Sequence, residues 1–74
     1  MTSQAKQALG DLANTAREAQ RVTGVVRDAL EKIVGWPYLH GVTRDAFVAM
    51  LDAEKAKSAF YADVQAVARL LGDA

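Results

Sequence analysis

Apolar residues recur along the first half of the chain with alternating spacings of four and three. The positions are Ala5, Leu9, Leu12, Ala16, Ala19, Thr23, Val26, Leu30 and Ile33, of which only Thr23 is polar. This spacing is typical of one face of an α-helix that packs against another helix. Ser3 is a suitable N-cap, Gly35 suits the end of a helix, and Pro37 cannot easily continue one. The pattern predicts a helix over residues 4–34, roughly 45 Å long at 1.5 Å per residue.

The second half of the chain repeats the rhythm after a short break. Its apolar stripe consists of Ala46, Met50, Ala53, Lys57, Phe60, Val64, Val67 and Leu71, with Lys57 as the polar exception. Thr43 is a suitable N-cap, Asp45 suits the positive end of the helix dipole, and Gly72 suits the end of the helix. We expect a second helix over residues 43–72 and a loop over residues 35–42.

Folded back at the loop, the two predicted helices bring complementary positions together. Ala19 is expected opposite Phe60, and the two polar exceptions, Thr23 and Lys57, coincide. Opposition of small and large side chains is what a close-packed seam between helices requires. The sequence therefore predicts an all-α fold, a long antiparallel two-helix hairpin that forms a single domain over residues 1–74.

Gly10 and Gly24 interrupt the first predicted helix. Each costs ~1 kcal/mol relative to alanine in a helix interior. Three interpretations fit the sequence: tolerated surface glycines, close approach of another backbone, or a bend at Gly24. We adopt a continuous helix as the working prediction.

More apolar residues flank the two stripes than a single hairpin covers. They are Ala8, Val22, Val25 and Ala29 in the first helix and Val48, Leu51, Tyr61 and Leu70 in the second. An apolar surface broader than one neighbour covers indicates a further packing partner, and 74 residues leave none for a third long helix. We therefore expect association with another protein chain, most simply as a homodimer of hairpins that forms a four-helix bundle. The alternative, association with a different chain, stays open.

The predicted loop contains the sequence GWPYLHG, with the only tryptophan, proline and histidine of the chain. Its large side chains fit two interpretations, a lid packed over the end of the hairpin or an exposed recognition tip. For a recognition tip, the predicted contact residues are Trp36, Tyr38 and His40. A second predicted contact surface is the helix face with Val22, Val25 and Arg21.

Charge bears on one alternative function, nucleic-acid binding. Nine Lys and Arg residues balance nine Asp and Glu residues, so the formal net charge is +0, whereas nucleic-acid binders normally carry a basic excess. Arg17 and Arg21 are like charges one helical turn apart, and together with Arg27 they form the candidate phosphate-binding face. A small dimeric nucleic-acid-binding regulator is thus the alternative to a protein-binding function.

The sequence contains no residue pattern typical of an enzyme. It has no cysteine, its serines lack the G-x-S-x-G context, and its single histidine has no metal-ligand spacing. The longest apolar run, IVGWPYL, is far shorter than the ~20 residues that cross a bilayer. We predict a cytoplasmic, non-enzymatic interaction protein without cofactor, metal or membrane partner: a small adaptor, inhibitor or assembly subunit.

Overall fold

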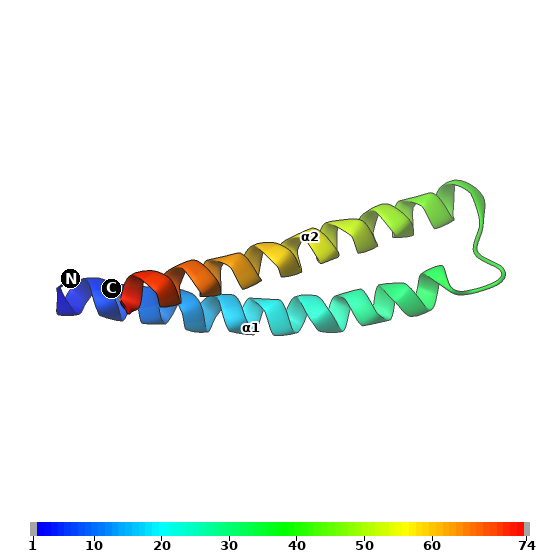
Figure 1. Cartoon of the computed structure of the whole chain (residues 1–74). Helices are drawn as coiled ribbons and strands as arrows, with labels where there is room; N and C mark the ends of the chain where they lie inside the picture. Colours follow the sequence, from blue (N-terminus) through cyan, green and yellow to red (C-terminus); the bar gives the residue numbers. More distant parts are fainter. Residues whose placement is uncertain (1, 74) are drawn as a thin grey trace.

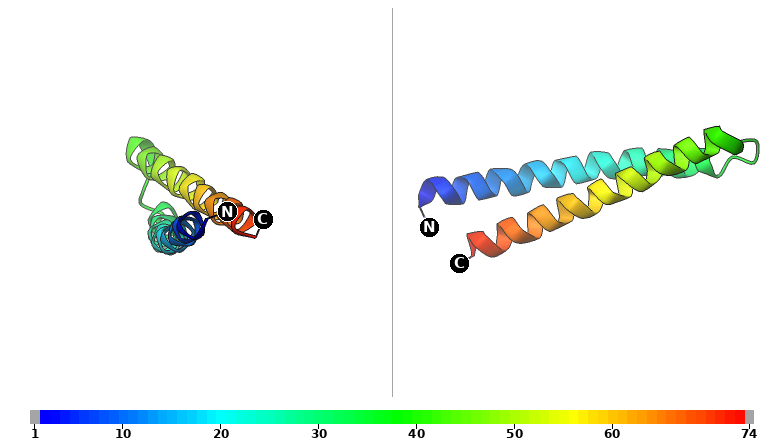
Figure 2. Two further views of the ribbon diagram at one scale, coloured as in Figure 1. Left: turned by 90° about the vertical axis from the view of Figure 1, so that its left-hand side faces the viewer. Right: turned by 90° about the horizontal axis from the view of Figure 1, so that it is seen from above.

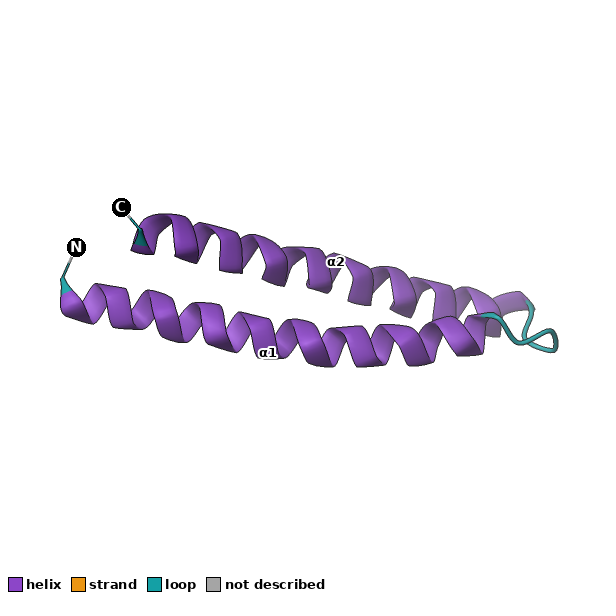
Figure 3. Ribbon diagram, turned by 60° about the horizontal axis from the view of Figure 1, so that its bottom comes forward, coloured by secondary structure: helices purple, strands orange, loops and turns teal. Residues whose placement is uncertain are grey.

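The computed structural model describes residues 2–73, which form two α-helices and the loop between them (Figure 1). α1 spans Ser3–Val34 and α2 spans Gly41–Gly72, with 32 residues each. The helices run antiparallel, so both chain ends lie at one end of the molecule and the loop closes the other (Figure 3). The result is a rod of 56 × 14 × 13 Å. The predicted all-α antiparallel hairpin is confirmed.

α1 runs without interruption through both of its internal glycines. A Cβ atom placed on Gly10 or Gly24 would meet no atom within 4 Å. Close approach of another part of this chain therefore does not explain either glycine, and the helix does not break at Gly24. The prediction of one continuous helix is confirmed.

The start of α1 corrects the predicted N-cap. Thr2, rather than Ser3, has the extended backbone of a cap, and its hydroxyl accepts a hydrogen bond of 3.1 Å from the amide of Ala5. At the far end, the amide of Gly35 donates to the carbonyl of Glu31 at 3.1 Å. Gly35 ends the helix with φ −77°, so its freedom to adopt a left-handed conformation is not used there.

α2 begins two residues earlier than predicted, which shortens the loop to residues 35–40. The N-cap is His40 rather than Thr43, and the side chain of His40 makes no capping hydrogen bond. Gly41 has φ +67°, a conformation in which an L side chain costs about 1–2 kcal/mol. This glycine therefore permits the early entry into α2, and Asp45 falls outside the first turn.

The two helices meet along a seam that follows a four-and-three spacing on each helix. The seam consists of Leu9, Ala13, Ala16, Gln20, Thr23, Arg27, Leu30 and Val34 of α1 and Phe47, Leu51, Glu54, Ser58, Tyr61, Gln65, Ala68 and Gly72 of α2. Most of these residues are half-buried, and four are buried: Ala16, Thr23, Leu51 and Ala68. Matched in antiparallel order, Thr23 falls opposite Ser58. The seam is thus built largely from small and polar side chains.

Hydrogen bonds between glutamines join the helices near the middle of the seam. Gln20 Nε2 donates to the carbonyl of Ser58 at 3.2 Å, and Gln65 Nε2 donates to Gln20 Oε1 at 2.7 Å. Gln65 Nε2 also lies 3.1 Å from the carbonyl of Tyr61, one turn earlier in the same helix. These contacts fix the register, because sliding one helix by a turn would break both inter-helix bonds.

The predicted seam was wrong for α2. Every residue predicted there comes one position before an observed seam residue, and one position corresponds to a rotation of about 100° around the helix. Met50, Phe60 and Val67 are consequently exposed, and 60% of Phe60 is accessible. Leu51 and Tyr61, which were predicted as flanking residues, lie in the seam instead.

The predicted seam of α1 was half right. Leu9, Ala16, Thr23 and Leu30 lie in the observed seam, whereas the other predicted positions lie beside it, among them the exposed Leu12 and Val26. The polar layer expected from Thr23 and Lys57 does not form either, because Thr23 is matched with Ser58. Size alone does not explain the difference, because the seam also contains Leu9, Leu51 and Tyr61. The observed series differs in containing Gln20 and Gln65, which bond across the seam.

A matched pair of glycine substitutions tests the backbone description. We expect Gly24→Ala to raise the free energy of unfolding by about 1 kcal/mol, since alanine is the better helix former and its Cβ meets open space. Gly41→Ala should lower it by about 1–2 kcal/mol, because its φ is left-handed. Urea unfolding followed by circular dichroism measures both, and a stabilising Gly41→Ala would contradict the assigned start of α2.

The glutamine contacts are testable by a double-mutant cycle. Gln20→Leu alone should destabilise the protein by about 1 kcal/mol, because Gln65 loses its inter-helix acceptor. Gln20→Leu combined with Gln65→Leu should recover much of that loss, since no half-satisfied amide remains. Denaturant midpoints of the four proteins give the coupling, and additive effects would show that the glutamines do not bond to each other.

Candidate interaction surface

Directly beside the seam, each helix carries a stripe that is almost wholly apolar. On both helices, the residue that precedes each seam position belongs to this stripe. The stripes consist of Ala8, Leu12, Thr15, Ala19, Val22, Val26, Ala29 and Ile33 of α1 and Ala46, Met50, Ala53, Lys57, Phe60, Val64, Val67 and Leu71 of α2. Thr15 and Lys57 are the only polar members. We call the two stripes together the apolar face.

Both stripes lie on the same side of the rod. Each is rotated from the seam by about one residue step, 100°, in the same sense around its own helix. α1 and α2 run in opposite directions (Figure 2). Because of this, the same sense of rotation leads to the same side of the hairpin. The apolar face is therefore one continuous surface that two helices share.

The other side of the rod is polar or small. The residues that follow the seam positions are Gly10, Asn14, Arg17, Arg21, Gly24, Asp28 and Glu31 of α1 with its C-cap Gly35, and Val48, Asp52, Lys55, Ala59, Ala62, Ala66 and Arg69 of α2 with its C-cap Asp73. Val48 is the one large apolar side chain among them. The hairpin is thus strongly two-sided, with an apolar face and a polar face.

The one charged residue of the apolar face is paired within its own helix. Lys57 Nζ lies 3.0 Å from Glu54 Oε1, and the Glu54 side chain, in the seam, is only 16% accessible. Glu54 thus draws the ammonium group toward the seam. The pairing leaves the apolar face without an unmatched charge.

The loop forms an exposed tip rather than a lid. Tyr38 is 89% accessible and Trp36 58% accessible, so neither ring covers the end of the hairpin. A turn bridges the tip, in which the amide of Leu39 donates to the carbonyl of Trp36 at 3.2 Å. His40 Nδ1 lies 2.9 Å from the carbonyl of Tyr38, a bond that requires the proton on Nδ1. The lid interpretation was wrong for Trp36 and Tyr38, whereas Leu39 is half-buried.

Trp36 also lines a shallow, open groove on α1. The groove is lined by Val25, Asp28, Ala29, Lys32, Ile33 and Trp36. Ala29 and Ile33 are members of the apolar face, whereas Asp28 belongs to the polar face, so the groove runs along the outer side of α1 and borders the apolar face. It connects two predicted contact residues, Val25 of α1 and Trp36 of the tip.

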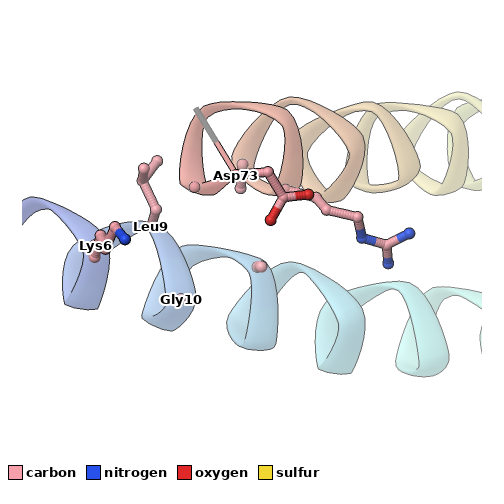
Figure 4. Close-up of a pocket in the computed structure, with 8 residues that line it drawn as sticks. Lys6, Leu9, Gly10 and Asp73 are labelled. Atoms are coloured by element: carbon pink, nitrogen blue, oxygen red, sulfur yellow. The ribbon is translucent and has the colours of Figure 1, made fainter. Parts of the chain in front are cut away.

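A second shallow groove lies at the open end of the hairpin, between the start of α1 and the end of α2 (Figure 4). It is lined by Lys6, Leu9, Gly10, Ala13, Ala68, Arg69, Gly72 and Asp73. The groove is open to solvent and combines alanine and glycine with two basic residues and one acidic residue. It has neither the enclosure nor the convergent polar groups of a small-molecule site.

The second predicted contact surface is divided by the structure. Val22 lies on the apolar face, Arg21 lies on the polar face, and Val25 points away from the seam between them. The bulky residues of α2 that share the apolar face, led by Phe60 and Met50, were missed as contact residues. Sequence reasoning had placed them inside the hairpin because they follow the helical rhythm so well.

The arginines of the alternative nucleic-acid function do not form one surface. Arg17 and Arg21 lie on the polar face, but Arg27 is a half-buried member of the seam. Arg17 Nη2 donates to Asn14 Oδ1 at 2.6 Å, and Arg21 donates twice to Glu18 Oε1, from Nη2 at 2.6 Å and from Nε at 3.1 Å. Only two of the three guanidinium groups are therefore presented side by side, and one is paired with a carboxylate.

The contact between Arg21 and Glu18 shifts both groups toward their charged forms. The hydrogen bond from Arg21 and its charge lower the pKa of the Glu18 carboxyl, and the same contact raises the pKa of Arg21. A lowered carboxyl pKa stabilises the fold above the unfolded pKa, and this contribution is lost as the pH falls through the folded pKa. Since both side chains are exposed, the contribution is small.

Two further properties concern the part of the chain that the structure describes. Within residues 2–73, no three His, Asp or Glu side chains come together closely enough to hold a metal ion. Neither helix in this range contains an apolar stretch long enough to cross a membrane.

Comparison of the chain with protein-family models, with curated proteins and with solved structures finds no significant match.

A pair of loop substitutions tests whether the tip is exposed. Tyr38→Ala should change the free energy of unfolding by less than about 0.5 kcal/mol, because nearly all of its surface is already in water. Leu39→Ala, at the half-buried neighbouring position, should cost about 1 kcal/mol or more. Thermal melts of both variants decide the matter, and a large loss for Tyr38→Ala would restore the lid interpretation.

Proposed function

We propose that this protein is a non-enzymatic, self-associating helical hairpin that acts in the cytoplasm by binding other protein chains, as a small adaptor, inhibitor or assembly subunit. The observation that carries the proposal is the placement of the large apolar side chains. Phe60, Met50 and Val67 lie outside the seam, whose buried residues are Ala16, Thr23, Leu51 and Ala68. A single hairpin leaves these side chains in water.

Exposed apolar surface of this extent is typical of a protein-binding site. Isolated apolar residues on a surface are ordinary, but contiguous ones mark interaction surfaces. The two stripes of the apolar face run side by side along the rod, so its exposed residues are contiguous. Burial of that surface against another chain supplies the driving force that the small seam residues cannot.

The tip is the proposed contact for a partner other than a second hairpin. Trp36 and Tyr38 are exposed aromatic side chains, the type most frequent among binding hot spots. The bond from His40 to the Tyr38 carbonyl and the turn at Leu39 restrain the loop, which reduces the ordering cost of binding. The tip therefore resembles a small, preformed recognition loop at the end of a rigid rod.

The alternative, nucleic-acid binding, has less support. A phosphate-binding surface needs several unpaired basic groups on one side, whereas Arg27 lies in the seam and Arg21 is bonded to Glu18. The balanced net charge weakens long-range attraction to a polyanion further.

Sensitivity to salt separates the two functions. We expect the purified protein at micromolar concentration to sediment as a species heavier than the 7.9 kDa chain, both at 0.1 M and at 1 M sodium chloride. A hydrophobic contact changes little over that range, but a phosphate contact weakens steeply. Labelled duplex DNA and RNA, followed by fluorescence anisotropy, should show no tight binding at 0.15 M salt. A purely monomeric protein would contradict the proposed self-association, and tight, salt-sensitive DNA or RNA binding would favour the alternative.

A further inference from the structure

We propose that the apolar face is the contact surface for a second copy of this chain, which lies on it face to face and completes a closed four-helix bundle. This inference rests on the proposed function and deepens it, since it assigns the self-association to one surface and to one occupant. The arguments concern area, shape, charge and the position of Phe60.

The exposed area of the hairpin exceeds that of a compact monomer by the amount a dimer interface needs. The chain exposes 5419 Å², whereas a compact folded monomer of 7.9 kDa exposes about 4,400 Å². The excess is about 1,000 Å² per chain. A standard stable interface covers about 800 Å² on each partner, so one interface of ordinary size brings the hairpin to the exposure of a compact protein.

The shape of the apolar face matches that of an identical surface. It consists of two antiparallel helical ridges that follow a four-and-three spacing along the rod. Such a surface packs best against two more helices of the same length with the same spacing. A second copy offers both properties by construction, and a two-fold axis closes the assembly without leaving another apolar face exposed.

The charges of the face are compatible with self-pairing. In a two-fold contact every residue type of one copy meets the same surface of the other, so an unpaired charge would be repeated near its own image. Lys57 is the only charged residue of the face, and it is bonded to Glu54 of its own helix at 3.0 Å. The remaining members are apolar apart from Thr15, and burying them against their copies opposes no like charges.

Phe60 lies near the centre of the face. It precedes Tyr61, the seam residue that lies beside Gln20 and its hydrogen bonds in the middle of the rod. Binding energy concentrates in large side chains near the centre of an interface. Phe60 is therefore expected to be the main anchor between the two copies.

A matched pair of lysine substitutions tests the assignment. Phe60→Lys places a charge on the apolar face, and Ala59→Lys places the same side chain one residue earlier, on the polar face. We expect the wild type and Ala59→Lys to sediment as dimers with similar dissociation constants. Phe60→Lys should raise the dissociation constant roughly 30-fold or more, which is the loss of 2 kcal/mol or more that defines a hot spot.

The single tryptophan provides a second readout that needs no substitution. Trp36 shares its groove with Ala29 and Ile33 of the apolar face and is 58% accessible in the single hairpin. Its fluorescence emission should shift to shorter wavelength as the wild-type concentration rises through the dissociation constant, and to longer wavelength on dilution. This measurement keeps the test valid if Phe60→Lys fails to fold as judged by circular dichroism.

The outcomes separate this inference from the proposed function. A wild type that stays monomeric overturns both. A wild type that associates, while Phe60→Lys leaves the association intact or Ala59→Lys disrupts it, overturns the assignment of the surface but not the self-association. Trimers, open-ended assemblies or Trp36 emission that ignores concentration likewise overturn the closed dimer, whereas a dimer lost only in Phe60→Lys supports it.

Discussion

The structure depends on the contact between α1 and α2 along a seam in which small and hydrogen-bonding side chains alternate with larger apolar ones. Ala16 and Ala68 are buried there because they occupy little space, and Gln20 and Gln65 bond across the seam without leaving a buried polar atom unsatisfied. These hydrogen bonds fix the register of the two helices. The large side chains of the apolar face, among them Phe60 and Met50, lie outside the seam and are exposed.

That surface is one face of the rod, because the two large-residue stripes are rotated from the seam in the same sense on antiparallel helices. The consequence is a molecule whose inside is less apolar than one of its outer sides. In most small domains the interior is the more apolar part, and a chain of this size that lacks cysteine rarely builds a sufficient core alone. The association proposed above would account for this arrangement, and the pairing of Lys57 with Glu54 and the exposed area favour a second hairpin as the partner.

Much of the fold was predictable from the sequence. The four-and-three spacing predicted two long helices, and the GWPYLHG segment predicted the turn between them. The helix ends were less predictable, since Thr2 and His40 replaced the expected caps Ser3 and Thr43. α2 begins at Gly41, whose positive φ a glycine adopts without strain. No pattern in the sequence required the helix to begin there.

The sequence by itself determined that both halves are helical, that each carries an apolar stripe, and that the loop between them holds the aromatic residues Trp36 and Tyr38. It left open whether these residues form a lid or an exposed tip. Only the tertiary structure decided which side of each helix faces the other. A four-and-three rhythm is unchanged when every position moves by one residue, so Phe60 and Tyr61 belong to equally regular series. Hydrophobicity favoured the series with Phe60 for the interior, whereas the series with Tyr61 contains Gln65, which bonds to Gln20 across the seam. A bond of this kind is a property of two helices together, and it accompanies Tyr61 in the seam and Phe60 on the outer face.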